Sequence, residues 1–245
     1  MITIANQKMK KIELIRELEK HVVFNLKTVR EITGKGSSYA KLLVYRIKKD
    51  NLITEIERNK YTMKKDPLLI ASNIIWPSYI SFWSALRYHN LTEQLPQDVM
   101  VITTRTRKKR KIDFNNIKII FIKIKPKYLF GYRKERYHGA YIFMAEPEKA
   151  LIDSALFKKI SFSEIYSVMK NNLSTINIEL LLAYLIKIRN KALIKRFGFL
   201  LDNLGTGAHK KLKKFIDFKY IPLDYSLPAK GKKDKKWKVI KNAQL

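Results

Sequence analysis

The sequence of 245 residues contains no cysteine. This absence excludes disulfide bonds, thiolate catalysis and cysteine-based zinc sites, and it fits a reducing cytoplasm, where we expect the protein to reside. No apolar run approaches the roughly 20 residues that a membrane-spanning helix needs. The first residues also lack the apolar core of a signal peptide. We therefore expect a cytoplasmic protein without a membrane segment.

Acidic residues are scarce. The 21 Asp and Glu residues stand against 51 Lys and Arg, which gives a formal net charge of +30 and a sequence isoelectric point near 10.1. Such a charge attracts polyanions from a distance. A thermophilic or lysine-rich background usually raises Glu together with Lys, so the imbalance favours nucleic acid as the partner. An acidic protein or an anionic membrane surface is the alternative.

Motifs of enzymatic chemistry are missing as well. The four histidines show no metal-binding spacing, and residues 34–37 lack the upstream glycine and strand of a phosphate-binding loop. The few acids that could serve a nuclease are Asp98, Asp113, Glu146, Glu148 and Asp153. We therefore expect no catalytic site, no metal and no cofactor. A nucleic-acid-processing enzyme is the alternative, and loss of metal-dependent turnover on changing Asp153 would reveal it.

The first 66 residues begin with the pattern of two helices. Residues 8–20 predict an amphipathic helix with one buried stripe, made of Ile12, Ile15 and Leu18. After an extended segment, residues 26–32 predict a second helix. This helix is expected to end at Gly34, because glycine readily adopts the left-handed conformation found at helix C-termini.

A third helix is expected to start at a capping serine in the segment 36–38 and to run to about residue 49. Its core face is expected to contain Ala40, Leu43, Val44 and Ile47. Its opposite face carries Ser38, Lys41, Tyr45 and Lys48. Small polar and basic side chains near a helix start suit base edges and phosphates, because that end of the helix enters the major groove and favours anions.

A two-stranded hairpin follows, with strands at residues 52–56 and 60–63 joined by Arg58 and Asn59. Three helices and a hairpin form the order of a winged helix-turn-helix domain, which we place at residues 1–66. The residues predicted to contact DNA are Lys35, Ser37, Ser38, Lys41, Tyr45, Lys48, Arg58, Asn59 and Lys60. A protein-interaction module of the same order is the alternative.

The second predicted domain, residues 67–245, differs from the first in its pattern of expected helices and strands. A helix with aromatic packing residues is expected at residues 79–89, and three strands are expected at 99–104, 117–124 and 140–145. Further helices are expected from residue 146 and at 161–171, 177–189 and 190–203. The lysine-rich tail at 230–241 predicts either a basic arm or a last strand. The fold class is therefore α+β, with a winged helix, a small sheet and a helical C-terminal part.

A basic loop connects the first two of these strands. Six of its seven residues are basic and none is acidic: Arg105, Arg107, Lys108, Lys109, Arg110 and Lys111. Such a run is often a solvated loop. Beside a DNA-reading domain, it is also a candidate to bind phosphates or the acidic surface of a partner.

Several segments resemble the AbiEi antitoxins of type IV toxin–antitoxin and abortive-infection systems. They are PSYISFWSALRYHNLTEQLP at 77–96, VITTR at 101–105, AEPEKALID at 145–153, PLD at 222–224 and KWKV at 236–239. Together with the N-terminal domain, the similar segments extend over most of the chain.

The resemblance implies a DNA-binding N-terminal domain that represses its own operon. It also implies a C-terminal domain that counteracts a nucleotidyltransferase-type toxin without a cofactor and without the need for a stable complex. Its partners would be the operator duplex and that toxin. A regulator with no toxin partner is the closest alternative.

Overall fold

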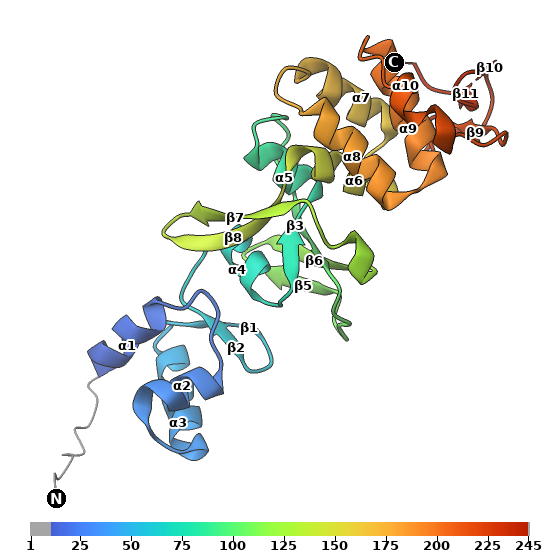
Figure 1. Cartoon of the computed structure of the whole chain (residues 1–245). Coiled ribbons are helices and arrows are strands. Elements are labelled where there is room, and N and C mark those ends of the chain that lie inside the picture. Colours follow the sequence, from blue (N-terminus) through green and yellow to red (C-terminus); the bar gives the residue numbers. More distant parts are fainter. Residues whose placement is uncertain (1–10, 245) are drawn as a thin grey trace, which may run out of the picture.

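The computed structural model describes residues 11–244, and it confirms an α+β protein. Figure 1 shows an elongated molecule in which the N-terminal helices and hairpin form one end. A mixed β-sheet occupies the middle, and a group of helices with the C-terminal strands forms the other end. The hydrophobic core is divided accordingly into a small N-terminal cluster and a much larger one.

The N-terminal part contains α1 (Lys11–Glu19), α2 (Leu26–Thr33), α3 (Ser37–Lys49), β1 (Thr54–Glu57) and β2 (Lys60–Thr62). Asn25 caps α2 by accepting a hydrogen bond from the amide of Thr28, and Gly34 ends the helix with a φ of 64°. Phe24 pairs with Tyr61 through two backbone hydrogen bonds of 2.9 and 2.8 Å. The expected order of three helices and a hairpin is therefore present.

Two expectations for these helices are wrong. The buried residues of α1 are Leu14 and Leu18, whereas Ile12 is 64% exposed and Ile15 is half-buried. Leu14 and Leu18 are four residues apart, so they face α2 and α3 together. The expected start of this helix at residues 8–10 lies outside the described residues. No serine caps α3, because its N-cap is Gly36 and the cap makes no side-chain hydrogen bond.

The middle of the molecule is a sheet of strand order β5-β6-β4-β3-β8-β7. The strands are β3 (Ser78–Ile80), β4 (Asp98–Thr103), β5 (Lys111–Phe114), β6 (Ile117–Lys123), β7 (Tyr132–Tyr137) and β8 (Ala140–Ala145). β4 runs parallel to β6, and β3 runs parallel to β8 and antiparallel to β4. The three expected strands are present, but the sheet is twice as wide as the sequence predicted.

The helix that was expected at residues 79–89 is shorter than predicted, because residues 78–80 form a strand. They form the central strand β3, whose three side chains are all buried, and only α5 (Phe82–Tyr88) is helical. The extended backbone of Ser81 separates the strand from the helix. Burial on both faces removes the polar alternation that identifies a strand in a sequence. Phe82 of α5 packs in the core as expected.

The remaining helices surround the sheet and form the C-terminal end (Figure 1). They are α4 (Pro67–Asn73), α6 (Pro147–Leu156), α7 (Phe162–Asn171), α8 (Ile178–Ile188), α9 (Lys191–Asn203) and α10 (His209–Leu212), with short 3-10 turns η1 (Pro126–Tyr128) and η2 (Lys213–Phe215). The expected helices from residue 146 to 203 are confirmed. Side chains cap three of them, because Ser161, Asn177 and Asn190 accept hydrogen bonds from first-turn amides.

The lysine-rich tail forms strands. β10 (Lys232–Asp234) pairs with β11 (Val239–Lys241), which pairs in turn with β9 (Ile221–Pro222). Between β10 and β11, the indole of Trp237 is 1% exposed and packs on Gly198 of α9. Across residues 11–244, no helix is long and apolar enough to cross a membrane.

Candidate nucleic-acid interface

The exposed face of α3 carries most of the predicted DNA-contacting residues. The helix buries Ala40, Val44 and Ile47, whereas Ser37, Ser38, Lys41, Tyr45 and Lys48 are exposed. Tyr45 is 64% exposed. Within the described residues, no hydrogen bond or ion pair involves the side chains of Ser38, Lys41 or Tyr45. These groups are therefore free to meet an external ligand.

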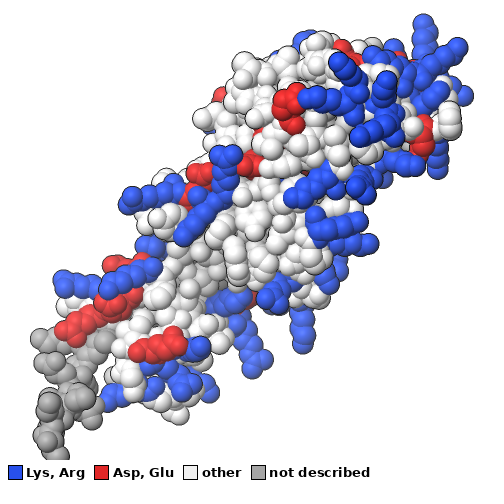
Figure 2. Space-filling view, viewed as in Figure 1, with Lys and Arg blue, Asp and Glu red and all other residues white. Residues whose placement is uncertain are grey.

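The charges of α3 are all positive. The helix contains Lys41, Arg46, Lys48 and Lys49 and no acid. Lys48 differs from the others because its ammonium group binds the carboxylate of Glu55 in β1, and this hydrogen bond raises the pKa of Lys48. Figure 2 shows Lys and Arg over much of the visible surface, with acidic side chains gathered near α1. The three glutamates of α1 stand beside Lys11 and Arg16, whereas α3 carries four cations and no acid.

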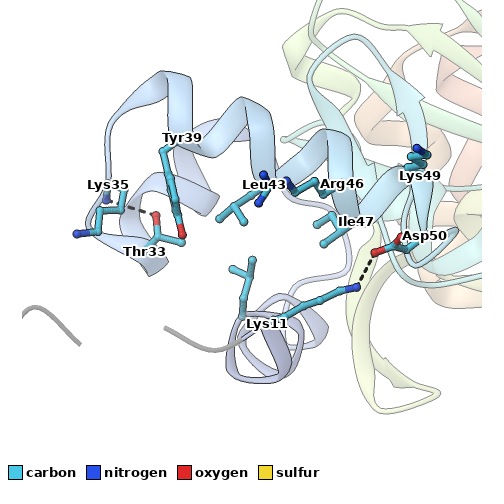
Figure 3. A pocket seen from close by; sticks show the side chains of 10 residues that line it. Lys11, Thr33, Lys35, Tyr39, Leu43, Arg46, Ile47, Lys49 and Asp50 are labelled. Carbon is cyan, nitrogen blue, oxygen red and sulfur yellow. Dashed lines mark hydrogen bonds and ion pairs between the residues drawn. The ribbon is translucent and has the colours of Figure 1, made fainter. Parts of the chain in front are cut away.

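A hollow of about 430 Å³ lies between α1 and α3 (Figure 3). Its apolar wall includes Tyr39, Leu43 and Ile47, and the ion pair between Lys11 and Asp50, with an N–O distance of 2.5 Å, crosses its edge. Lys35, another predicted contact residue, lies on the rim. Helical spacing puts this wall on a different side of α3 from Ser38, Lys41 and Tyr45. The hollow is therefore separate from the proposed reading face.

The hairpin presents fewer cations than the sequence suggested. Arg58 is exposed at the turn, and no hydrogen bond or ion pair engages its side chain within residues 11–244. Asn59 accepts a hydrogen bond of 3.0 Å from the amide of Leu26, at the start of α2. Lys60 donates a hydrogen bond of 2.7 Å to the carbonyl of Ile74. Of the three predicted wing residues, Arg58 alone points outward without a partner in the described chain.

The hairpin is joined to the second domain by Glu57. Its carboxylate binds the ammonium of Lys60 at 2.7 Å and the guanidinium of Arg107 at 2.5 Å. The Arg107 guanidinium also lies 4.0 Å from the centre of the Phe121 ring, and its side chain is only 9% exposed. Burial alone would raise the pKa of Glu57, but the two cations outweigh burial and lower it.

The basic loop therefore contains two kinds of residue. Arg107 is folded inward at the domain junction. Arg105 is exposed but donates a hydrogen bond of 3.3 Å to the carbonyl of Trp76. The exposed basic residues that remain are Lys108, Lys109, Arg110 and Lys111. Sequence reasoning grouped all six together because it could not show Glu57, which lies 50 residues before Arg107.

Three of the five carboxylates that were candidates for chemistry, Glu146, Glu148 and Asp153, are buried, whereas Asp98 is half-buried and Asp113 is exposed. Asp153 is fully buried, forms an ion pair with Lys149 and accepts hydrogen bonds from Tyr79 at 3.1 Å and Ser81 at 2.9 Å. Burial raises the pKa of Asp153, against the opposing effect of Lys149, and burial lowers the pKa of Lys149. This buried polar cluster links α6 to the central strand β3.

Glu146 and Glu148 also hold neighbouring elements together. Glu146 binds Arg133 at 2.5 Å and accepts a hydrogen bond from Tyr184, and Glu148 accepts one of 2.6 Å from the amide of Asn177. In the part of the chain that the structure describes, no group of three or more His, Asp or Glu side chains could hold a metal ion. The i, i+4 spacing of Lys149 and Asp153 was the sequence signal for the buried cluster, which sequence reasoning did not use.

Comparison with known proteins adds no assignment. No protein-family model matches the chain, and no curated protein matches it significantly. The resemblance to AbiEi antitoxins therefore stays a prediction that rests on the segments quoted above.

Proposed function

We propose that the protein is a non-enzymatic transcriptional regulator that reads duplex DNA with α3. The observation that carries the proposal is the exposed face of Ser38, Lys41 and Tyr45, which contains no acid and whose side chains are not engaged by the described chain. Hydroxyl, ammonium and phenol groups on a helix of this kind can hydrogen-bond base edges and phosphates in the major groove.

Two further features support DNA as the ligand. The hairpin places Arg58 beside the three helices, where a guanidinium can contact phosphate or the minor groove. The net charge of +30 gives a long-range attraction for a polyanion, so binding is expected to weaken steeply as salt rises.

The finer part of the proposal is an antitoxin that represses its own operon and counteracts a nucleotidyltransferase-type toxin. Its support is the similarity of residues 77–96 and 145–153 to AbiEi antitoxins. In the fold these segments contribute β3, α5 and α6, which meet at the cluster of Tyr79, Lys149 and Asp153. The similar segments thus build one continuous region of the second domain.

The first experiment separates base reading from phosphate binding. Ser38→Ala with Lys41→Ala should reduce the preference of the full-length protein for its promoter over random duplex by about 1 to 3 kcal/mol. Arg58→Ala should weaken binding to both duplexes evenly. Lys210→Ala, an exposed lysine at the far end of the molecule, is the charge-matched control. Equal losses on both duplexes for all variants would show that α3 does not read bases.

The second experiment tests the antitoxin part with cells that express the neighbouring toxin gene. The Ser38→Ala and Lys41→Ala protein should lose repression and still restore growth. Alanine at Lys108, Lys109, Arg110 and Lys111, with Arg107 kept, should lower the salt slope of duplex binding by about 0.9 for each phosphate that the loop no longer neutralises. If the loop variant instead keeps repression but no longer restores growth of cells that express the toxin, the loop is needed for the antitoxin activity. Failure of the wild-type protein to restore growth would leave a regulator without antitoxin activity.

A further inference from the structure

Two large aromatic side chains lie exposed on the second domain, away from α3. Trp76 is 56% exposed and Tyr141 is 53% exposed. The Trp76 ring lies 4.5 Å from the ring of Phe143, measured between centres. Phe143 and Tyr141 are two residues apart on β8, so their side chains share one face of the strand about 7 Å apart. The three rings form a row on the surface.

Cations line this row. The register of β7 and β8 pairs Lys134 with Phe143 and Arg136 with Tyr141, so both cations share the aromatic face. The ammonium of Lys134 lies 4.0 Å from the centre of the Tyr141 ring. Arg105 lies beside Trp76, because its guanidinium donates a hydrogen bond to the Trp76 carbonyl.

The acid of β7 lies on the other face of the hairpin. Glu135 pairs with Ile142, whose side chain is fully buried on the opposite side of β8 from Tyr141. We call the surface of Trp76, Phe143, Tyr141, Arg105, Lys134 and Arg136 the aromatic-basic face. It combines two exposed aromatic side chains, Trp76 and Tyr141, with positive charge and no acid from the hairpin of β7 and β8.

We propose that the aromatic-basic face binds single-stranded nucleic acid. Exposed bases stack on aromatic rings, and cations beside the rings bind the phosphates between successive bases. A duplex cannot stack its bases on these rings, because the faces of its bases are already stacked on each other. The face adjoins the winged domain, since the carbonyl that Lys60 binds belongs to Ile74, two residues before Trp76. The full-length protein would therefore have a duplex site on α3 and a separate single-strand site on the sheet.

The test uses the full-length protein and labelled oligonucleotides of about 12 nucleotides, a length within the range that such sites occupy. Fluorescence anisotropy would measure binding of single-stranded DNA, RNA of the same sequence, and the matching duplex. Trp76→Ala and Tyr141→Ala should each weaken single-strand binding roughly 5- to 100-fold, with duplex binding changed less than about twofold. The comparison of single-stranded DNA with RNA of the same sequence shows which of the two nucleic acids the aromatic-basic face prefers.

Two aromatic substitutions serve as matched controls. Phe218→Ala removes a ring that is 92% exposed outside this face, and it should change neither affinity. Tyr45→Ala should weaken the duplex and spare the single strand, which also separates this proposal from duplex reading by α3. Because Tyr141 is a surface residue, Tyr141→Ala keeps the test valid even if Trp76→Ala disturbs the neighbouring loop.

Tryptophan fluorescence gives a second measurement. Single strands should quench the emission of the wild-type protein, and Trp76→Phe should abolish most of the quenching, since Trp237 is buried and the half-buried Trp83 belongs to α5, outside the aromatic-basic face. The proposal is overturned if Tyr141→Ala binds single strands as the wild type does, or if single-strand and duplex affinities fall together. It is also overturned if single strands leave the emission unchanged.

Discussion

Replacement of Lys149 by methionine tests whether the buried polar cluster is structural. The side chains of Lys149 and Asp153 are 0% and 1% exposed, and Tyr79 and Ser81 complete the hydrogen bonds of the pair. Lys149→Met keeps the length of the side chain but leaves Asp153 buried with only two neutral donors. Removal of one partner of a buried ion pair costs about 3 to 5 kcal/mol. This is a large share of the roughly 5 to 15 kcal/mol that stabilises a typical domain.

The matched variant removes both charges. Lys149→Met with Asp153→Leu should recover most of the lost free energy of unfolding, because no charge then remains desolvated. Urea denaturation followed by circular dichroism would give the free energies. Single variants within about 1 kcal/mol of the wild type, or a double variant less stable than both single variants, would refute the reasoning. An enzymatic role for Asp153 predicts instead a loss of turnover with stability retained.

Three further predictions concern stability. Gly198→Ala should lower the melting temperature, although alanine favours helices by about 1 kcal/mol, because the new Cβ would lie only 1.9 Å from the buried Trp237 ring. Asn25→Ala should cost about 1 kcal/mol in urea denaturation through loss of the α2 cap, and full stability of that variant would contradict the capping geometry. Folding lowers the pKa of Glu57. Its contribution to the free energy of unfolding is therefore complete above the ordinary pKa of 4.5 and is lost as the pH falls through the lower pKa of the folded protein. Glu57→Gln should therefore be less stable at neutral pH and lose less stability on acidification, and parallel pH profiles for the two proteins would count against the assigned ion pairs.

The sequence predicted the elements whose signals are local. α2, α3 and the hairpin follow from helical spacing, Gly34 and the turn at Arg58 and Asn59, and α7 to α9 follow from their apolar periodicity and polar caps. β3 was missed because three consecutive buried residues have no polar alternation. The edge strand β7 was missed because four of its six residues are charged, as is common where an edge faces solvent. The edge strand β5 does alternate exposed and buried residues, but it has only four residues and begins at Lys111, the last residue of the basic run that the sequence predicted as a loop.

The candidate interface was predictable only in part, for a physical reason. The exposure of Lys41 and Tyr45 follows from the position of the core residues on the same helix. The contacts of Asn59, Lys60 and Arg107 depend on Leu26, Ile74 and Glu57, which are 33, 14 and 50 residues away from them along the chain. The sequence alone does not show whether a basic side chain forms an ion pair with a carboxylate that lies far from it along the chain.

The shared carboxylate of Glu57 makes the two domains thermodynamically linked. A ligand that takes Arg107 away from Glu57 would remove one of the contacts that hold the hairpin to the second domain, beside the hydrogen bond of Lys60 to Ile74 and the packing of Ile56 in the larger core. Such a ligand and DNA would then lower each other's affinity by the same factor, because a coupling free energy is reciprocal. A ligand that leaves this ion pair intact, and binds only the exposed lysines of the same loop, would carry no such cross-effect through it. If α3 binds DNA as proposed, the ion pair of Glu57 and Arg107 is therefore one contact through which occupancy of the second domain would change that affinity.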